Sequence, residues 1–578
     1  MNIFYEMASR LGFYKDVKNC LLKGFTPCAV TGVSNIHKAQ TAMALSRLSP
    51  CLVICDDEAS AIRMTGDINE MAGEQLACVF PAKDLNFAYM EGVSREYEHK
   101  RLEALSLITQ GKCKIIAASM EACLQGTIPQ DKLKEFSFEI KTGGELSLEE
   151  LTSKLLAGGY TRTDQVEGQA QFSVRGSIAD IFPVQESRPV RIELWGDEVD
   201  SISYFDPESQ RRTDPIDEIM VFPALEIIFP DTDDLVTKLE ALSKSVRGSR
   251  TDKIRTNISR DIETAQSGIT LTNLDKYYTV CYDRLTTIFD YFQSGVCLVS
   301  EYTNCIEKGK AALAQLSEDM KLLYEDGILF RKLEGFYLDI PQAELKITQM
   351  KSVFLDSFMR SNNGVKFKKL INTDCRQTAA WGGNIINLEE ELKNLCSQGY
   401  CTVVLAGSEK TLPIINKDLN DAGISAEILT EDSEIIKGKV YLRTGCLSGG
   451  FDYPDIGCAA ITQMKAMSAK KRKSHHKAGE EIKSLSDIQT GDLVVHAMYG
   501  IGRFSGIKNI ETNGVTKDYI TIKYAGTDVL YVPVTQLDLV SRYIGPRDDG
   551  AVKLNKLNSM EWTKTRNKVK SAVKDMAE

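Results

Sequence analysis

Residues 25–48, FTPCAVTGVSNIHKAQTAMALSRL, decide the fold class of the first part of the chain. They join an apolar strand, a turn at Gly32 and, from His37 onward, apolar residues at helical spacing. Further apolar runs of strand length follow in CLVICDD, LACVFPAKD and KCKIIAASMEACL, the last of them after the helical pattern EHKRLEALSLITQ. Strands that alternate with helices in this way predict a parallel α/β sheet.

The same stretch has the outline of a phosphate-binding loop. Such a loop reads Gly, four residues, then Gly-Lys-Ser/Thr, because its backbone N–H groups surround the phosphates and its hydroxyl holds Mg²⁺. Here Gly32 opens the pattern and Lys38 takes the lysine position, but His37 replaces the second glycine and Ala39 the hydroxyl residue. The residues alone leave two interpretations open: an ordinary strand–turn–helix, or a nucleotide loop that has lost its chemistry.

The composition is that of soluble globular domains. The chain has 578 residues, 43% of them hydrophobic, and a net charge of −10, which disfavours a protein covered in nucleic-acid-binding surface. At about 150 residues per domain we expect roughly four domains. No apolar run is long enough to cross a membrane and no signal peptide is present, so we expect a cytoplasmic protein with no membrane partner. We expect the 15 cysteines to be reduced thiols, and the 5 histidines show no metal-ligand spacing.

A change in pattern near residue 141 predicts an insert in the α/β layer. FSVRGSIADIFPV, PVRIELWGDEVDSISYFD and EIMVFPALEIIF alternate like antiparallel strands. Helical patterns and the strand VCLVSEY then return the chain to the sheet, and a small α/β domain follows. The predicted domains are an α/β domain at 1–140 and 231–360, the insert at 141–230, and the small α/β domain at 361–465.

The last part of the chain predicts a small β domain. Residues 466–483 are lysine-rich and lack periodicity, which favours an exposed linker over a nucleic-acid arm. Four alternating strands within 484–546, with turns such as Asn513-Gly514, predict an SH3- or Tudor-like barrel whose core includes Tyr531 and Val532. Residues 547–578 read as the start of a helix, and we expect the natural protein to continue.

The insert carries the first resemblance to a known family. VRGSIADIFP and VRIELWGDEVDSISYFDPESQR resemble the insert domain of UvrB, a subunit of nucleotide excision repair, and still more the matching part of the transcription-repair coupling factor (Mfd) family. In that family the insert docks UvrA, and the matching residues are Arg175, Phe182, Arg191 and Glu193. Guanidinium groups beside an aromatic ring suit an interface hot spot. Their alternative roles are solvated strand charges for the arginines and sheet core for Phe182.

The barrel carries the second resemblance. HAMYGIGRFSGI, YITIKYAGTDVLYVPV and LVSRY are similar to the RNA-polymerase-interacting domain that coupling factors share with CarD-type transcription factors. The resemblance implies that an edge strand pairs with the β subunit of bacterial RNA polymerase, since open edges recruit partner strands. The best candidate is Lys508-Asn509-Ile510-Glu511, with Ile510 as the apolar contact or, alternatively, a barrel core residue.

Together the two motifs cover nearly the whole chain in the order of a coupling factor. The resemblance implies a degenerate UvrB-like sheet and an adaptor that binds stalled RNA polymerase and recruits UvrA. ATP-driven translocation on double-stranded DNA, with ATP and Mg²⁺, would belong to a superfamily-2 motor that this chain lacks, so no cofactor is expected here. Two alternatives stay open: a UvrB-type ATP-dependent damage-recognition subunit, although no tyrosine-rich hairpin follows PAKDLNFAYMEG, and a CarD-like transcription regulator.

Overall fold

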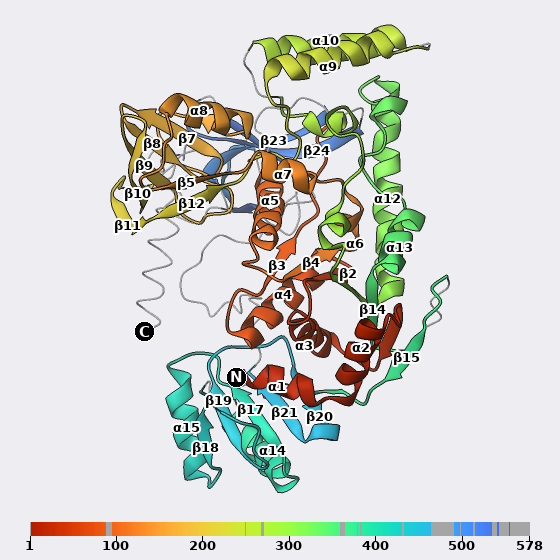
Figure 1. Cartoon of the computed structure of the whole chain (residues 1–578), viewed down its shortest axis with the longest axis vertical. Helices are drawn as coiled ribbons and strands as arrows, with labels where there is room; N and C mark the ends of the chain where they lie inside the picture. The colour runs from red at the N-terminus through yellow and green to blue at the C-terminus, as the bar shows by residue number, and fades with distance from the viewer. Residues whose placement is uncertain are drawn as a thin grey trace. The chain divides into compact units, whose positions relative to one another are not determined.

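The structure is a computed structural model of the chain (Figure 1). It describes residues 2–87, 95–207, 209–248, 250–267, 271–358, 364–378, 380–381, 384–430, 433–463, 490–496, 499–512, 515–526, 528–533, 540–542 and 554. The predicted linker at 466–483, the Asn513-Gly514 turn and nearly all of the predicted C-terminal helix lie outside these residues. The chain divides into two compact units, one containing most residues up to Met467 and one containing Ser468–Glu578 with two short segments, Pro207–Gln210 and Asp319–Ile328.

A seven-stranded parallel sheet forms the centre of the first unit, as the sequence predicts. Its strand order is β15-β1-β14-β13-β2-β4-β3, and every neighbouring pair is parallel. β13 and β14 follow the insert in the chain but lie between β1 and β2, so the insert interrupts one continuous sheet. The strands are β1 (Cys28–Thr31), β2 (Cys51–Cys55), β3 (Ala77–Phe80), β4 (Ile115–Ser119), β13 (Val296–Ser300), β14 (Lys351–Asp356) and β15 (Lys369–Asn372).

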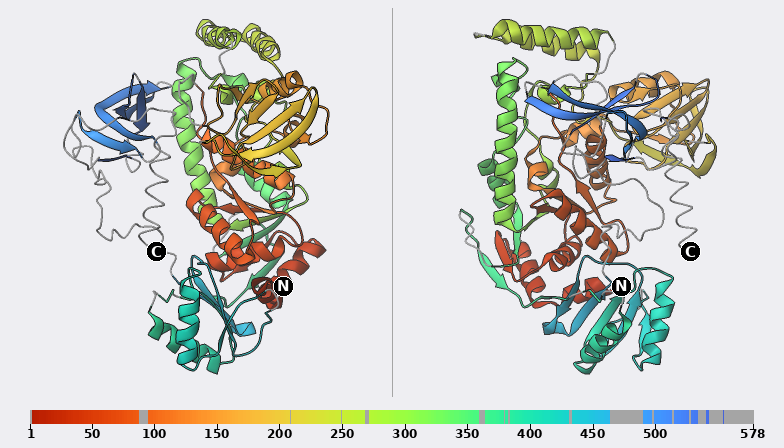
Figure 2. Two further views of the ribbon diagram at one scale, coloured as in Figure 1. Left: turned by 90° about the vertical axis from the view of Figure 1, so that its left-hand side faces the viewer. Right: turned by 180° about the vertical axis from the view of Figure 1, so that it is seen from behind.

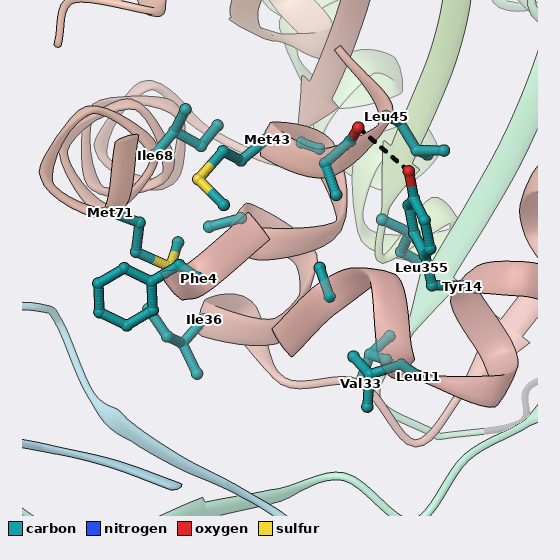
Figure 3. Packing of buried hydrophobic residues seen from close by; sticks show 14 of the residues in the cluster. Phe4, Leu11, Tyr14, Val33, Ile36, Met43, Leu45, Ile68, Met71 and Leu355 are labelled. Carbon is teal, nitrogen blue, oxygen red and sulfur yellow. Dashed lines mark hydrogen bonds between the residues drawn. The ribbon is translucent and has the colours of Figure 1, made fainter. Parts of the chain in front are cut away.

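Helices cover this sheet and bury its apolar strands. Phe4, Ile36, Met43, Ile68 and Met71, from three helices, pack together in one hydrophobic core (Figure 3). Tyr14 lies in the same core and donates a hydrogen bond from its hydroxyl to the carbonyl oxygen of Ala44. The helices of this domain are α1 (Ile3–Arg10), α2 (Gly12–Lys23), α3 (Asn35–Leu45), α4 (Glu58–Ala72), α5 (Glu96–Thr109), α6 (Met120–Leu124), α7 (Gln130–Glu135), α9 (Thr232–Ser245), α10 (Thr251–Gln266), α11 (Tyr278–Cys281), α12 (Tyr302–Glu325) and α13 (Ile340–Gln349).

The predicted insert is a six-stranded sheet in the order β11-β10-β9-β8-β7-β6, antiparallel except between β6 and β7. Two-residue turns at Gly176-Ser177 and Gly196-Asp197 join its central hairpins, and both glycines have positive φ, as such turns require. The insert contains α8 (Leu148–Ala157), β6 (Thr161–Arg162), β7 (Gln171–Arg175), β8 (Ile178–Ile181), β9 (Val190–Trp195), β10 (Glu198–Phe205) and β11 (Arg212–Ile216), while β5 (Phe138–Lys141) and β12 (Glu218–Val221) pair separately.

A buried charge network lies where the chain leaves the insert. The guanidinium of Arg101 is fully buried and bonds Glu226 at 2.9 Å, the carbonyl oxygens of Pro81 and Gly126, and Gln125. Lys83 also lies 2.8 Å from Glu226. Burial raises the pKa of Glu226, but the charges of Arg101 and Lys83 outweigh it and lower that pKa overall.

The small α/β domain packs on α3 and α4 and shares their core. Its mixed sheet has the order β16-β20-β21-β17-β19-β18. Arg443 donates to the carbonyl oxygens of Glu70 and Met71, and Ser448 donates to Asp67, so polar contacts surround the shared core. The domain contains α14 (Ile385–Ser397), α15 (Thr411–Asp421), β16 (Arg376–Thr378), β17 (Cys401–Leu405), β18 (Ala426–Ile428), β19 (Val440–Arg443), β20 (Gly450–Tyr453) and β21 (Cys458–Thr462).

The second unit contains a five-stranded antiparallel sheet in the order β25-β24-β23-β22-β26. Its closure into a barrel stays a prediction. Val532 is buried as expected, but the expectation for Tyr531 is wrong: alternation along the strand leaves it 42% exposed. The strands are β22 (Leu493–His496), β23 (Gly500–Thr512), β24 (Val515–Lys523), β25 (Val529–Pro533) and β26 (Val540–Arg542).

Candidate functional site

The loop between β1 and α3 uses its backbone donors within the protein. The N–H groups of Gly32 and Val33 both point to the carbonyl oxygen of Asp356, at 3.1 and 3.4 Å. Gly32 has φ +88°, and a Cβ built on it would lie 2.3 Å from the carbonyl oxygen of Thr373. The end of β14 and the residue after β15 therefore contact the start of the loop, and its first two amides are not free to bind phosphate.

His37 is part of the helix cap and of the domain interface. Ser34 and His37 form a capping box, in which the N–H of Ser34 donates to Nδ1 of His37 at 3.2 Å. The imidazole is fully buried, with ring centroids 5.2 Å from Tyr453 and 6.2 Å from Phe451 of the small α/β domain. Burial lowers its pKa to about 4, so the ring is neutral at pH 7.

Lys38 is neutralised by a carboxylate that directly follows β13. Its Nζ lies 2.6 Å from Oε1 of Glu301, and the lysine side chain is fully buried. Glu301 also accepts hydrogen bonds from the N–H and hydroxyl of Ser357. Burial raises the pKa of Glu301, but these hydrogen bonds and the charge of Lys38 lower it overall. Ala39 is buried in the helix-packing core.

Glu301 is the residue at this site that the sequence-based interpretation missed. It directly follows the buried strand VCLVS and has φ +55°, in the left-handed region that non-glycine residues rarely adopt. The carboxyl ends of parallel strands meet at one edge of a sheet, so a carboxylate at this place could have been expected near Lys38.

Three of the four predicted UvrA-docking residues lie on one face of the insert sheet. The register pairs Arg175 with Ile178 and Ile178 with Glu193, and paired residues share a face. Arg191 is two positions before Glu193 on β9 and has the same orientation. We call this surface, which carries Arg175, Arg191, Glu193 and Trp195, the insert face. Phe182 follows β8 and is half-buried.

The charged residues of the insert face differ in how far they are already engaged. Arg191 makes a two-pronged ion pair with the buried Asp180, at 2.7 and 2.8 Å, and lies over the ring of Phe205. Glu193 pairs with Arg212 and accepts from Ser201. Arg175 is exposed and donates only to a backbone carbonyl, that of Asp164, among the interactions of the described residues.

Trp195 is the second residue that the sequence-based interpretation missed. Its side chain is 83% exposed at the end of β9, beside the Gly196-Asp197 turn. The signal is the alternation of VRIELW: Val190, Ile192 and Leu194 are buried, so the other set faces outward. An exposed tryptophan among charged groups is typical of protein interfaces.

The candidate polymerase-binding segment occupies the distal half of β23. Lys508, Asn509, Ile510 and Glu511 pair with Tyr519, Asp518, Lys517 and Thr516 of β24. On its other side, β23 pairs with β22 only at Gly500–Arg503, so among the described strands this half of β23 is an open edge. Lys508 is exposed, while the side chains of the other three lie outside the description.

The described residues contain neither a metal-binding cluster nor a membrane-spanning helix. No group of three or more His, Cys, Asp or Glu side chains is placed there to hold a metal ion. None of the helices described is long and apolar enough to cross a membrane. All 15 cysteines are free thiols.

Two family matches define the class of protein. Residues 138–226 match the UvrB interaction domain, and residues 488–544 match the CarD-like/TRCF RID domain. The chain therefore combines an insert of the UvrB type with a domain of the CarD type, in that order.

Relatives that align with nearly the whole chain are transcription-repair-coupling factors, so the family resemblance seen in the sequence is confirmed. The chain is 29% identical to the Bacillus subtilis protein over 580 residues, which cover 98% of this chain and 49% of that one. Identity is 28% to the Staphylococcus haemolyticus protein, over 95% of this chain and 48% of the relative. The chain thus spans about half the length of the curated relatives it matches.

Proposed function

We propose that this chain is the adaptor part of a transcription-repair coupling factor, which docks UvrA through the insert face and RNA polymerase through the open edge of β23. The observation that carries the proposal is a contrast within the first unit. The insert face exposes Trp195 and Arg175, whereas in the loop between β1 and α3 the amides of Gly32 and Val33 are bonded to Asp356 and Lys38 is buried and paired with Glu301. The chain therefore exposes side chains suited to protein partners on the insert, whereas the cation that a UvrB-type enzyme would use for phosphate is occupied within the protein.

The UvrA arm of the proposal is tested by measuring binding of purified UvrA to the whole chain. Trp195→Ala removes an exposed aromatic anchor, and we expect a loss of affinity of about 30-fold or more, as for an interface hot spot. Leu156→Ala is the matched control, because Leu156 is 53% exposed on α8 of the same insert but is not on the insert face. Equal affinity of the Trp195 variant and the wild type would refute this docking surface, and circular dichroism checks that both variants are folded.

The polymerase arm is tested in the same way with core RNA polymerase. Ile510→Arg places a charge in the open half of β23, and we expect binding to be abolished. Tyr531→Arg is the matched control on β25, at the other edge of the described sheet. Loss of binding in the Tyr531 variant, with binding retained in the Ile510 variant, would show that the interface lies at the β25 edge and not on β23.

The enzyme alternative makes a separate prediction. A UvrB-type subunit would hydrolyse ATP in the presence of UvrA and damaged DNA, and Lys38→Ala would abolish this activity. We expect no hydrolysis above background, because Lys38 is buried against Glu301 and the loop amides are engaged. Lys38-dependent turnover would replace the adaptor proposal with the enzyme.

A further inference from the structure

The antiparallel helices α9 and α10 lie side by side (Figure 2). The turn that joins them is strongly basic. Residues 244–255, KSVRGSRTDKIR, carry five cationic side chains and one carboxylate, although the whole chain has a net charge of −10. The cationic residues are Lys244, Arg247, Arg250, Lys253 and Arg255, and all five are exposed. We call residues 243–248 and 250–255 the basic tip.

Two arginines of the basic tip are held in place by backbone oxygens rather than by carboxylates. Arg247 donates to the carbonyl oxygens of Lys244 and Val246, and Arg255 donates from Nε to that of Ser243 at 3.3 Å. Within the described residues neither guanidinium forms an ion pair. Each therefore keeps its full charge and further N–H donors in a restrained position, which suits recognition of an external anion.

The two guanidinium groups line one open concavity. Its volume is about 530 Å³, and its other lining residues are Ser243, Lys244, Val246, Gly248 and Thr251. Lys244 contributes a side chain that is 79% exposed, and its ion pair with Glu240, at 3.4 Å, is a surface pair of little strength. Serine and threonine hydroxyls add uncharged donors of the kind that contact phosphate oxygens.

The side chains around the concavity favour nucleic acid over a protein partner. Protein interfaces depend on aromatic and large apolar anchors. No large hydrophobic side chain is exposed among the described residues of α9, α10 and the turn between them, where the large apolar residues are buried or half-buried. A phosphate backbone needs only positive charge and hydrogen-bond donors.

From these observations we propose that the basic tip binds the phosphate backbone of double-stranded DNA without sequence preference. This contact belongs to the present chain and does not depend on UvrA, on RNA polymerase or on a motor. It can therefore fail while the adaptor proposal holds, and the reverse is also true.

The test measures binding of the whole chain to a random-sequence DNA duplex of about 30 base pairs by fluorescence anisotropy, between about 50 and 200 mM salt. Each phosphate contact contributes about −0.9 to the slope of log affinity against log salt. We expect Arg247→Gln/Arg255→Gln to lower affinity at least tenfold at the lowest salt and to make the slope shallower by about 2. The control Lys308→Gln/Lys310→Gln removes the same charge from exposed positions on α12 and should bind as the wild type does.

Two results of this measurement would overturn the proposal: no binding of duplex by the wild type at low salt, or an unchanged slope in the double arginine variant. The proposal would also be wrong if the double arginine variant kept its DNA binding but lost polymerase binding, because the basic tip would then bind the polymerase. A measurement without substitutions guards against misfolded variants. Acetylation of Lys244 by a water-soluble ester should be fast in the free chain and slowed several-fold by duplex DNA. Equal rates with and without DNA would also contradict the proposal.

Discussion

Lys38 and Arg175 are both cations on elements where the sequence predicts a functional site, but their surroundings differ completely. Lys38 is buried and paired with Glu301, and its neighbour His37 fills the interface with the small α/β domain. Arg175 is exposed beside a hairpin turn, on the same face as Trp195. Burying a charge without a partner is very costly, so a buried cation must be matched inside the protein, whereas an exposed one remains available to a partner. The comparison predicts that substitutions at buried cations change stability and those at exposed cations change binding.

The largest expected effect is at Arg101, which is fully buried. Arg101→Ala removes a partner of the buried Glu226 and leaves the carbonyl oxygens of Pro81 and Gly126 without their donor. We expect a loss of about 3–5 kcal/mol of unfolding free energy, measured by urea denaturation. Lys100→Ala, which breaks an exposed pair with Glu96 on the same helix, is the control and should have little effect. Similar midpoints for the two variants would contradict the distinction between buried and exposed cations.

The next effect is expected at Lys38, on the helix that follows the loop after β1. Lys38→Met leaves Glu301 largely buried without its cation and should cost about 2–4 kcal/mol in urea denaturation. Lys38→Met/Glu301→Gln removes both charges, and we expect it to be more stable than the single variant, because no uncompensated charge remains. If Lys38 were instead poised for nucleotide, its loss would leave stability unchanged and the double variant would show no recovery.

These contrasts also show what the sequence could predict. The buried strands CLVIC and VCLVS and the alternation of VRIELW predicted the parallel sheet and the antiparallel insert, because burial follows local pattern. The partner of Lys38 is 263 residues away, and the partner of Arg191 lies on the neighbouring strand, so both depend on tertiary pairing that local pattern does not contain. Trp195 belongs to the same visible alternation, but it lies outside the residues that the family resemblance marks.

A pH measurement sharpens the contrast for His37. Its pKa is about 4 in the folded chain because of burial, against an ordinary value of 6.5, so between these values the unfolded chain binds one more proton. The contribution of His37 to the free energy of unfolding is complete above pH 6.5. It falls as the pH is lowered, by about 1.4 kcal/mol per pH unit, so that about 2 kcal/mol is lost at pH 5.

The variant His37→Gln tests this assignment. Glutamine at this position can keep the reciprocal bond of the capping box with Ser34 but does not titrate. The difference in unfolding free energy between wild type and variant should therefore move in favour of the variant as the pH falls from 7 to 5. Burial also lowers the pKa of His99 to about 4. His99 titrates in both the wild type and the variant, so its contribution cancels in the difference between their unfolding free energies. A difference that does not change with pH would place the His37 ring in contact with solvent.

The smallest effect on stability separates the two arginines of the insert face. Arg191→Gln leaves the buried Asp180 without its charged partner, and we expect a loss of about 1–2 kcal/mol in urea denaturation. Arg175→Gln loses only bonds to an exposed backbone carbonyl and should leave the unfolding midpoint unchanged. Both variants should weaken UvrA binding if the insert face docks UvrA, but only for Arg175 can that weakening be read directly as a lost contact. If Arg175→Gln destabilises the chain as much as Arg191→Gln does, then exposure does not separate docking residues from structural ones on this face.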